Sequence, residues 1–384
     1  MQEIYDILII GGGINGAGIA RDAAGRNLKV CLVEKNNVGS ATSSWSTKLI
    51  HGGLRYLENY EFKLVRESLK EREIINYIAN DIVKPIPFII PHLPSQRPRW
   101  LIQLGLLLYD FLGGKSSLPK SKKIVINKEV PNILKADFKI GFKYFDLQVD
   151  DKKLVQLNID DAVKKGALII ENNKVVKALR INNIWSIILE NNKIIKSKIL
   201  INASGPWIND VLKNVIKLDI SNPIRLVKGS HIITKKLYKQ DIAFTLQNYD
   251  KRIVFVIPFK NKYSLIGTTE TEVNSPNNPV IDKNEINYLI KTVNNFFINQ
   301  ISHEDIVYSY SGIRPLIEDF KKEVSKVTRD YVFDINVNNN SAPLLNIYGG
   351  KLTTYRKLAE NALKLLSNYI PRDKSSSWTH NKKL

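Results

Sequence analysis

A glycine-rich turn near the start of the chain has the residue types and spacing of a dinucleotide-binding site. It lies between an apolar run and an alanine-rich stretch, and comprises Gly11, Gly13 and Gly16 in the pattern G-x-G-x-x-G, with Ile14 and Asn15 before the last glycine. Such glycines let the backbone approach a pyrophosphate, whose charge the following helix N-terminus stabilises. Glu34 stands about 20 residues further on, where a carboxylate accepts hydrogen bonds from ribose hydroxyls and disfavours NADP.

Two later turns have the small residues that allow a backbone to approach a cofactor. One follows the apolar run 198–201 and contains Ala203, Ser204, Gly205 and Trp207. The other follows the run 344–348 and contains Gly350 before a helix-like stretch. Either turn alone is more often a simple strand exit. A flavin ring needs its own anion-stabilising group, so three glycine-bearing strand exits on one chain favour FAD over NAD.

The surrounding pattern predicts the elements that position these turns. Residues 4–33 have the sequence of a strand, a turn, a helix and a strand, and residues 61–80 that of an amphipathic helix. Asp150 and Asp151 stand where an N-cap belongs before a helix over 154–165, and short strands follow up to residue 201. Five prolines over 85–98 predict a loop-rich insertion. The predicted fold class is α/β.

The predicted architecture has two domains. Strands dominate from residue 224, with one helix over 285–297, which indicates a mixed, mainly antiparallel sheet that caps the substrate. A discontinuous, Rossmann-like FAD-binding domain is predicted over residues 1–82, 146–222 and 329–372. The cap is predicted over residues 83–145 and 223–328, and a tail over 373–384.

Composition limits the function classes. The chain has 384 residues, one cysteine and a formal net charge of +20. A single cysteine favours a reducing compartment and leaves no multi-cysteine metal site, and no metal is expected. The N-terminus lacks a signal peptide, and the longest apolar run, 100–112, is shorter than the ~20 residues of a spanning helix. The charge favours anionic partners, although a lysine-rich surface explains it equally well; no nucleic-acid motif accompanies it.

Longer segments resemble the FAD-dependent glycerol-3-phosphate dehydrogenases of the aerobic, quinone-linked type. They span nearly the whole chain and are 11–24, 41–44, 48–57, 205–207, 228–231, 251–258, 266–269, 311–316 and 349–356. The last segment, GGKLTTYR, is far more specific than the glycine motif. Family members continue into a further helical C-terminal domain, whereas this sequence stops at Leu384, and Trp45 stands where a small residue is expected.

This resemblance implies a flavoprotein fold of the glutathione reductase and glycine oxidase type. It implies oxidation of sn-glycerol 3-phosphate to dihydroxyacetone phosphate, with electrons passed to a membrane quinone. Two alternatives stay open: a glycerophosphate oxidase that uses oxygen, and a shortened flavin-binding protein without activity.

The resemblance also implies the residues of the active site. Arg55 is expected to bind the substrate phosphate, and Arg314 to stabilise the alkoxide that develops as hydride leaves. Lys351 is expected to contact the phosphate or the flavin edge, and Tyr56 to hydrogen-bond the substrate or pack. His231 is the leading candidate for the base because imidazole titrates near neutral pH.

The rival base is Glu270, which follows two threonines in the segment 266–269. Further FAD contacts are expected in the resembling segments, at Thr42, Ser43, Leu49, His51, Gly52, Gly53, Leu352 and Thr353.

The expected location is the cytoplasm, peripheral on the inner face of the cytoplasmic membrane. Arg97, Arg99 and the apolar run 100–112 are a candidate helix for contact with an anionic membrane, and a buried core helix is the alternative. A homodimer is left open.

Overall fold

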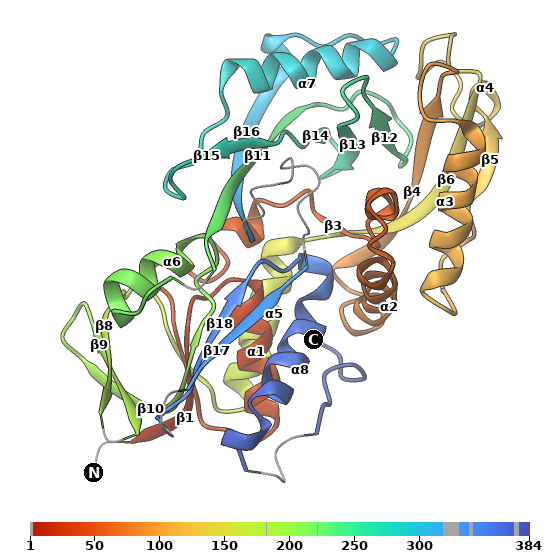
Figure 1. The fold of residues 1–384 in the computed structure, drawn as a ribbon. Coiled ribbons are helices and arrows are strands. Elements are labelled where there is room, and N and C mark those ends of the chain that lie inside the picture. The colour runs from red at the N-terminus through yellow and green to blue at the C-terminus, as the bar shows by residue number, and fades with distance from the viewer. Residues whose placement is uncertain (1–2, 182, 221, 318–329, 338–340, 372–375) are drawn as a thin grey trace.

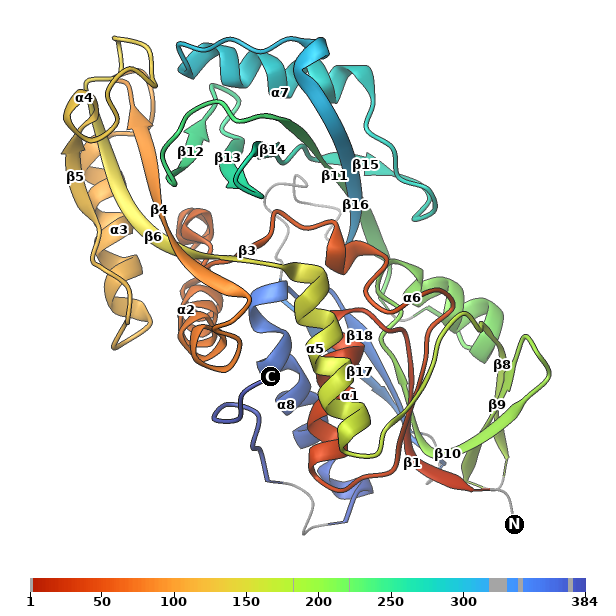
Figure 2. The same cartoon turned by 180° about the vertical axis from the view of Figure 1, so that it is seen from behind.

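Two β-sheets and the helices packed on them form the molecule (Figure 1). The structure is a computed structural model and describes residues 3–181, 183–220, 222–317, 330–337, 341–371 and 376–384. In Figure 1 the first sheet lies below, with α1, α5 and α8 beside it, and the second lies above, beneath α7. Figure 2 shows the same arrangement from behind.

The first sheet is mostly parallel, in the order β17-β18-β10-β1-β2-β7, with the antiparallel hairpin β8–β9 attached to β10. Its strands are β1 (Ile4–Ile10), β2 (Val30–Val33), β7 (Leu168–Ile170), β8 (Val175–Ile181), β9 (Ile184–Leu189), β10 (Ile194–Asn202), β17 (Val332–Asn336) and β18 (Leu344–Tyr348). Because β1, β10 and β18 run parallel as neighbours, their carboxyl ends lie at one edge of the sheet. The three predicted glycine turns therefore begin side by side.

Three helices cover one face of this sheet: α1 (Ile14–Gly25), α5 (Asp151–Lys164) and α8 (Tyr355–Leu365). Gly18 permits the close contact of α1 with α8, since a Cβ there would lie 2.7 Å from the Tyr355 ring. Asp150 caps α5 by accepting a hydrogen bond of 3.0 Å from the Lys153 amide, which confirms the predicted N-cap.

The second sheet is mainly antiparallel, in the order β15-β11-β14-β13-β12-β4-β6-β3, with β16 paired to β11 and β5 to β6. Its strands are β3 (Leu49–Ile50), β4 (Val83–His92), β5 (Lys122–Val125), β6 (Ile140–Val149), β11 (Ile224–Lys235), β12 (Ala243–Gln247), β13 (Ile253–Phe259), β14 (Tyr263–Gly267), β15 (Thr271–Val273) and β16 (Ile306–Ile317). Helix α7 (Lys283–Phe296) covers it with an apolar stripe of Leu289, Val293 and Phe296.

The loop predicted over the prolines is wrong for its first half, because Pro85, Pro87 and Pro91 lie in strand β4. All three lie at odd-numbered positions of the strand. Their backbone nitrogens, which carry no hydrogen, therefore point to the same side, away from β6. On that other side β12 pairs only with Phe88 and Ile89. The prolines therefore leave no ladder hydrogen bond unmade, which is how a strand tolerates them.

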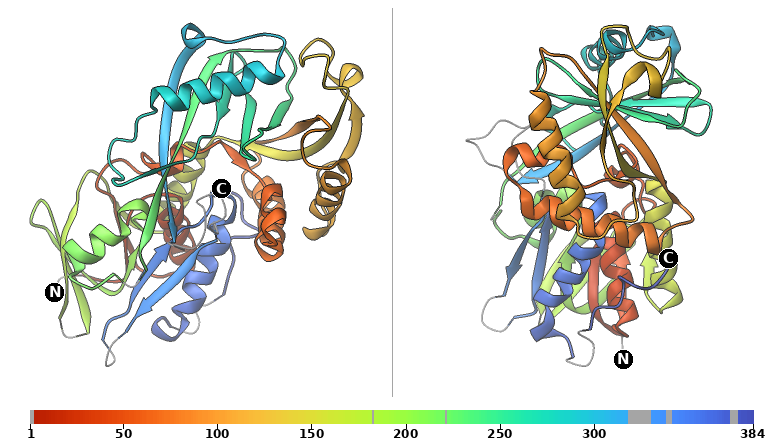
Figure 3. Two further views of the ribbon diagram at one scale, coloured as in Figure 1. Left: turned by 45° about the horizontal axis from the view of Figure 1, so that its top comes forward. Right: turned by 90° about the vertical axis from the view of Figure 1, so that its right-hand side faces the viewer.

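Helices α2 (Phe62–Ile78) and α3 (Arg99–Leu112) stand beside the junction of the sheets, as Figure 3 shows from two further sides, and α4 (Ile126–Glu129) and α6 (Ile208–Asp210) are short. Helix α2 confirms the amphipathic helix predicted over 61–80. Among the described residues, none of the helices has the length and apolar character to cross a membrane.

The strands of the first sheet come from the ranges predicted for the FAD-binding domain, but β3 from that range joins the second sheet. The domain division stays a prediction. Its boundaries at 328/329 and 372/373 involve residues outside those that the structure describes.

Candidate active site and FAD cleft

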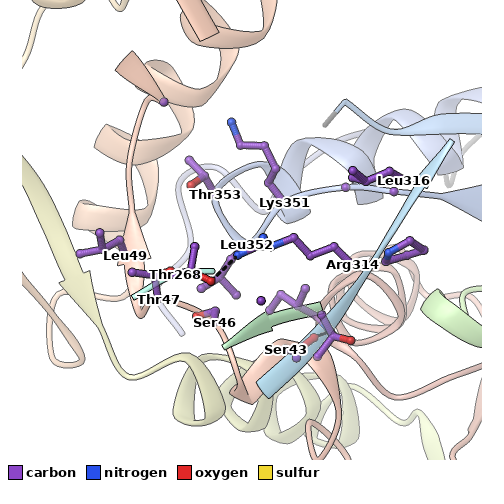
Figure 4. A pocket seen from close by; sticks show the side chains of 18 of the residues that line it. Ser43, Ser46, Thr47, Leu49, Thr268, Arg314, Leu316, Lys351, Leu352 and Thr353 are labelled. Atoms are coloured by element: carbon purple, nitrogen blue, oxygen red, sulfur yellow. Dashed lines mark hydrogen bonds between the residues drawn. The ribbon is translucent and has the colours of Figure 1, made fainter. Parts of the chain in front are cut away.

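A cavity of about 860 Å³ lies between the two sheets, at the carboxyl ends of β1, β10 and β18. Gly13, Gly205 and Gly350, one from each predicted turn, all line it. The turns are far apart in the sequence but meet at one cavity because their strands are parallel neighbours. Figure 4 shows part of its lining, with the Arg314 side chain extending toward Thr268 and Leu352.

The first turn fits tightly against its neighbours. Gly11 has φ +109°, and a Cβ there would lie 2.5 Å from the Ala203 carbonyl oxygen. A Cβ on Gly16 would lie 2.0 Å from the Gly11 carbonyl oxygen. Gly16 is therefore needed for packing and does not line the cavity, whereas Gly11, Gly13, Ile14 and Asn15 do. The prediction that Gly16 itself contacts the cofactor finds no support in its position.

Polar groups surround the N-terminus of α1. The Ile14 amide donates to the Ser43 hydroxyl at 2.9 Å, and both residues line the cavity. Glu34 accepts hydrogen bonds from the Gly12 amide at 2.7 Å and the Asn36 amide at 2.9 Å, so its carboxylate is fixed at the end of β2. This arrangement offers a helix N-terminus for a pyrophosphate and an acid for a ribose.

The turns at 51–53 and 351–353 hold each other. The Thr353 hydroxyl donates to the His51 carbonyl oxygen and accepts from the His51 amide, each at 3.2 Å. His51, Gly53 and Thr353 line the cavity, but Gly52 lies behind its wall. The other predicted cofactor residues that line the cavity are Glu34, Thr42, Ser43, Leu49, Ala203, Ser204, Gly205, Trp207, Gly350 and Leu352.

Four of the predicted catalytic residues form two linked pairs on the cavity wall. Arg55 Nη1 lies 3.6 Å from the Glu270 carboxylate. The Lys351 ammonium donates to the Ser68 hydroxyl at 2.9 Å and lies 4.5 Å from the centre of the Tyr56 ring. Because these residues come from separate segments, their meeting depends on the whole fold.

Arg314 on β16 is the fifth predicted catalytic residue that lines the cavity. Its Nη2 donates to the Thr268 hydroxyl at 3.2 Å, the dashed line in Figure 4. Thr268 was not among the predicted site residues, although it lies in a segment that carried the family resemblance. Asp146 and Phe255 also line the cavity and were missed, since their strands alone gave no chemical signal.

His231, the leading candidate for the base, does not line the cavity. The side chain is fully buried outside the cavity lining, stacks on Tyr310 with ring centres 4.8 Å apart, and lies 3.0 Å from the Thr47 hydroxyl through Nε2. Burial lowers the pKa of His231 well below its usual value, and the nearby charges of Arg314 and Lys48 lower it further. Thr47 lines the cavity and so separates His231 from it.

The cavity fits an extended dinucleotide with a redox ring at one end. It combines a helix N-terminus suited to an anion, a carboxylate suited to a ribose, and glycine backbone at positions where side chains would collide. Arg55, Arg314 and Lys351 line the same cavity as the turns at 51–53 and 351–353, and add positive charge for an anionic flavin or substrate.

Comparison with known proteins identifies the fold and cofactor. Residues 6–356 match the family model described as FAD dependent oxidoreductase (DAO). The chain belongs to this family. FAD is thus its cofactor, and the predicted α/β flavoprotein fold is confirmed.

Two similar proteins are named as dehydrogenases of polyol phosphates. The chain is 46% identical over 374 residues to the aerobic glycerol-3-phosphate dehydrogenase of Escherichia coli, which covers 96% of this chain and 74% of that protein. It is 45% identical over 385 residues to the D-erythritol 1-phosphate dehydrogenase of Brucella abortus, covering 98% and 76%.

Solved structures agree with the fold. The glycerol-3-phosphate dehydrogenase of Bacillus halodurans complexed with FAD matches with a TM-score of 0.71 and 25% identity over 95% of this chain and 65% of that one. The FAD-bound L-α-glycerophosphate oxidase of Mycoplasma pneumoniae matches with a TM-score of 0.75 at 17% identity, over 95% of each chain, which shows a common fold alone.

Proposed function

We propose that this FAD enzyme oxidises sn-glycerol 3-phosphate to dihydroxyacetone phosphate. The observation that carries the proposal is the group Arg55, Arg314, Lys351 and Glu270 on one cavity wall, beside the turns that face the cofactor. Three cations suit a phosphate and a developing alkoxide, and one carboxylate suits removal of a hydroxyl proton. The relatives named for this activity support the same substrate.

Each polar group has a part in the reaction. When bound, FAD accepts a hydride from C2 of the substrate. Arg55 binds the phosphate, since a guanidinium offers paired donors to phosphate oxygens. Arg314, held by Thr268, stabilises the charge on the C2 oxygen. Glu270 takes the hydroxyl proton in place of His231, which does not reach the cavity.

An apolar wall excludes water from these groups. Phe88, Tyr144 and Phe255 line the cavity from strands β4, β6 and β13, and the Phe88 ring packs against both others with centres 5.2 and 5.9 Å apart. Charge interactions strengthen where water is excluded. The wall therefore increases the effect of Arg314 on the substrate oxygen.

The surface around α3 supports a membrane quinone as electron acceptor. Leu101, Leu104 and Leu108 line the cavity, while the same helix exposes Trp100, Leu107 and Phe111 by 64%, 53% and 60%. The exposed Lys115 and the Lys120 ammonium, 4.9 Å from the centre of the Phe111 ring, add charge for anionic headgroups. The enzyme would then bind peripherally to the inner face of the cytoplasmic membrane and take quinone from it.

A longer polyol phosphate is the second candidate substrate. The D-erythritol 1-phosphate dehydrogenase matches this chain as well as the glycerol-3-phosphate dehydrogenases do. A glycerophosphate oxidase remains the alternative for the acceptor, and production of hydrogen peroxide in step with substrate would identify it.

Anaerobic flavin bleaching tests the proposal. The purified yellow protein should lose its absorbance near 450 nm on addition of glycerol 3-phosphate, and more slowly with D-erythritol 1-phosphate. Arg314→Ala should stay yellow but bleach more slowly by on the order of 10², as for loss of an oxyanion donor. A wild-type protein that dithionite bleaches but neither polyol phosphate does would contradict the proposal.

A further inference from the structure

A row of buried polar groups lies directly behind the turn at 51–53. The Gly52 amide donates to the Tyr109 hydroxyl at 2.7 Å. That hydroxyl lies 2.8 and 2.9 Å from the two carboxylate oxygens of Asp146. Arg72 Nη1 in turn donates to Asp146 at 2.9 Å. The row therefore runs from α2 through β6 and α3 to the backbone of the turn.

The hydrogen-bond directions follow from the number of protons available. Asp146 forms an ion pair with Arg72 and, as a carboxylate, offers acceptors only, so the single proton of the Tyr109 phenol points to it. The lone pair of the hydroxyl is then left to accept from the Gly52 amide. Arg72, Tyr109 and Asp146 are exposed by only 5%, 3% and 3%. A group so buried cannot replace a lost partner with bulk water.

Packing reinforces this contact. A Cβ on Gly52 would lie 2.5 Å from the Leu69 side chain of α2 and 2.7 Å from the Tyr109 ring of α3. The backbone of the turn is thus pressed against both helices. Its neighbours His51 and Gly53 line the cofactor cavity. A shift at Gly52 would move both of them.

We propose that Tyr109 is a positioning residue, whose hydroxyl fixes the turn at 51–53 against the cofactor through Gly52. Thr353 holds the same turn from the cavity side, and Tyr109 holds it from behind. Tyr109 itself does not line the cavity, although its partner Asp146 does, and Asp146 has no part in the proposed reaction. The measurement of kcat and KM rests on the proposed substrate, whereas deuterium exchange and the flavin spectrum test the role of Tyr109 without it.

Tyr109→Phe removes one oxygen atom and keeps the ring that packs on Gly52. We expect the purified variant to take up deuterium faster than wild type in peptides spanning 49–57, and its visible flavin circular dichroism to change. With glycerol 3-phosphate, kcat should fall by about tenfold or more while KM stays within about twofold, because misplacement affects the reaction more than binding.

Tyr238→Phe is the matched control. Tyr238 is also buried, and its hydroxyl donates to the Val256 carbonyl oxygen at 3.3 Å within the core of the second sheet, outside the cavity lining. This variant should leave deuterium uptake at 49–57, the flavin spectrum and kcat unchanged.

Two results would overturn the proposal: wild-type exchange and spectrum in Tyr109→Phe, or equal effects in both variants. A wild-type enzyme that glycerol 3-phosphate does not reduce would instead contradict the proposed function, while the exchange and the spectrum would still decide the role of Tyr109.

Discussion

The Arg55 guanidinium and the Glu270 carboxylate lie 3.6 Å apart on the wall of the cofactor cavity, although they are 215 positions apart in the chain. The pair is mostly buried, with side chains exposed by 23% and 8%. A substrate phosphate that bound Arg55 would therefore lie close to a carboxylate able to accept a proton. This relationship supports Glu270 as the base in the proposed reaction.

Glu270→Gln should retain FAD but slow anaerobic reduction by glycerol 3-phosphate by at least about 10², the lower range for loss of a general base. The amide keeps the size of the side chain but cannot take up the proton. Stopped-flow absorbance near 450 nm measures the rate.

Glu272→Gln is the matched control, since Glu272 lies two residues on, outside the cavity lining, and pairs with Arg225 through a side chain exposed by 49%. Equal rates in Glu270→Gln and wild type would remove Glu270 from the mechanism.

Local pattern predicted the first sheet and the cofactor turns well, because their signals lie within short segments. The glycines of residues 11–16 have a fixed spacing, and the apolar runs before each turn are short parallel strands. The prolines of β4 led to the wrong prediction of a loop. Whether a strand can contain them depends on how far the neighbouring strand β12 extends, which no local pattern reveals.

Local pattern also misled the prediction for His231, because a contact with a distant segment decided its position. Gly229, two residues earlier on β11, lines the cavity, so strand alternation places His231 on the same face. Thr47 lines the cavity and hydrogen-bonds the His231 ring, and this contact joins residues 184 positions apart. Alternation predicts a face of a sheet, but not what lies over it.

Gly11→Ala should give protein with little or no bound FAD. The new Cβ would lie 2.5 Å from the Ala203 carbonyl oxygen, and φ +109° is strained for alanine. Both effects displace the turn that we propose receives the pyrophosphate. The ratio of absorbance at 450 nm to that at 280 nm measures the bound cofactor.

Gly166→Ala controls for backbone strain alone. Gly166 has φ +88°, but a Cβ there would meet no atom within 4 Å. This variant should keep its FAD, and a Gly11→Ala protein with the same FAD content would show that the first turn tolerates a side chain.

His231 should make folding stability depend on pH. Burial lowers the pKa of His231 in the folded protein, whereas the unfolded chain titrates near 6.5, so the unfolded state binds more protons between these two values. Stability due to His231 is thus full above about pH 6.5 and falls below it, by at most about 1.4 kcal/mol per pH unit.

His231→Asn removes this titration. Urea unfolding should show that the stability difference between wild type and variant shrinks as the pH falls from 7.5 to 5.5. The reduction rate of His231→Asn should stay within about tenfold of wild type. A loss of 10² or more, as for a general base, would return His231 to the mechanism.

The exposed face of α3 should bind anionic membranes. Leu107 and Phe111 are exposed by 53% and 60% and do not line the cavity, so Leu107→Glu with Phe111→Glu should leave anaerobic reduction by substrate unchanged. Because each substitution removes a large apolar side chain that would be buried in the membrane, binding of the double variant to phosphatidylglycerol vesicles should weaken by at least about tenfold.

Vesicle sedimentation measures this binding, and quinone reduction within the same vesicles should fall in parallel. Val307→Glu is the control, because Val307 on β16 is exposed by 53% but lies on the second sheet rather than on α3. It should bind vesicles as wild type does. If all three proteins bind equally, α3 is not the membrane contact, and if the α3 variant loses binding but keeps quinone reduction, the quinone enters by another route.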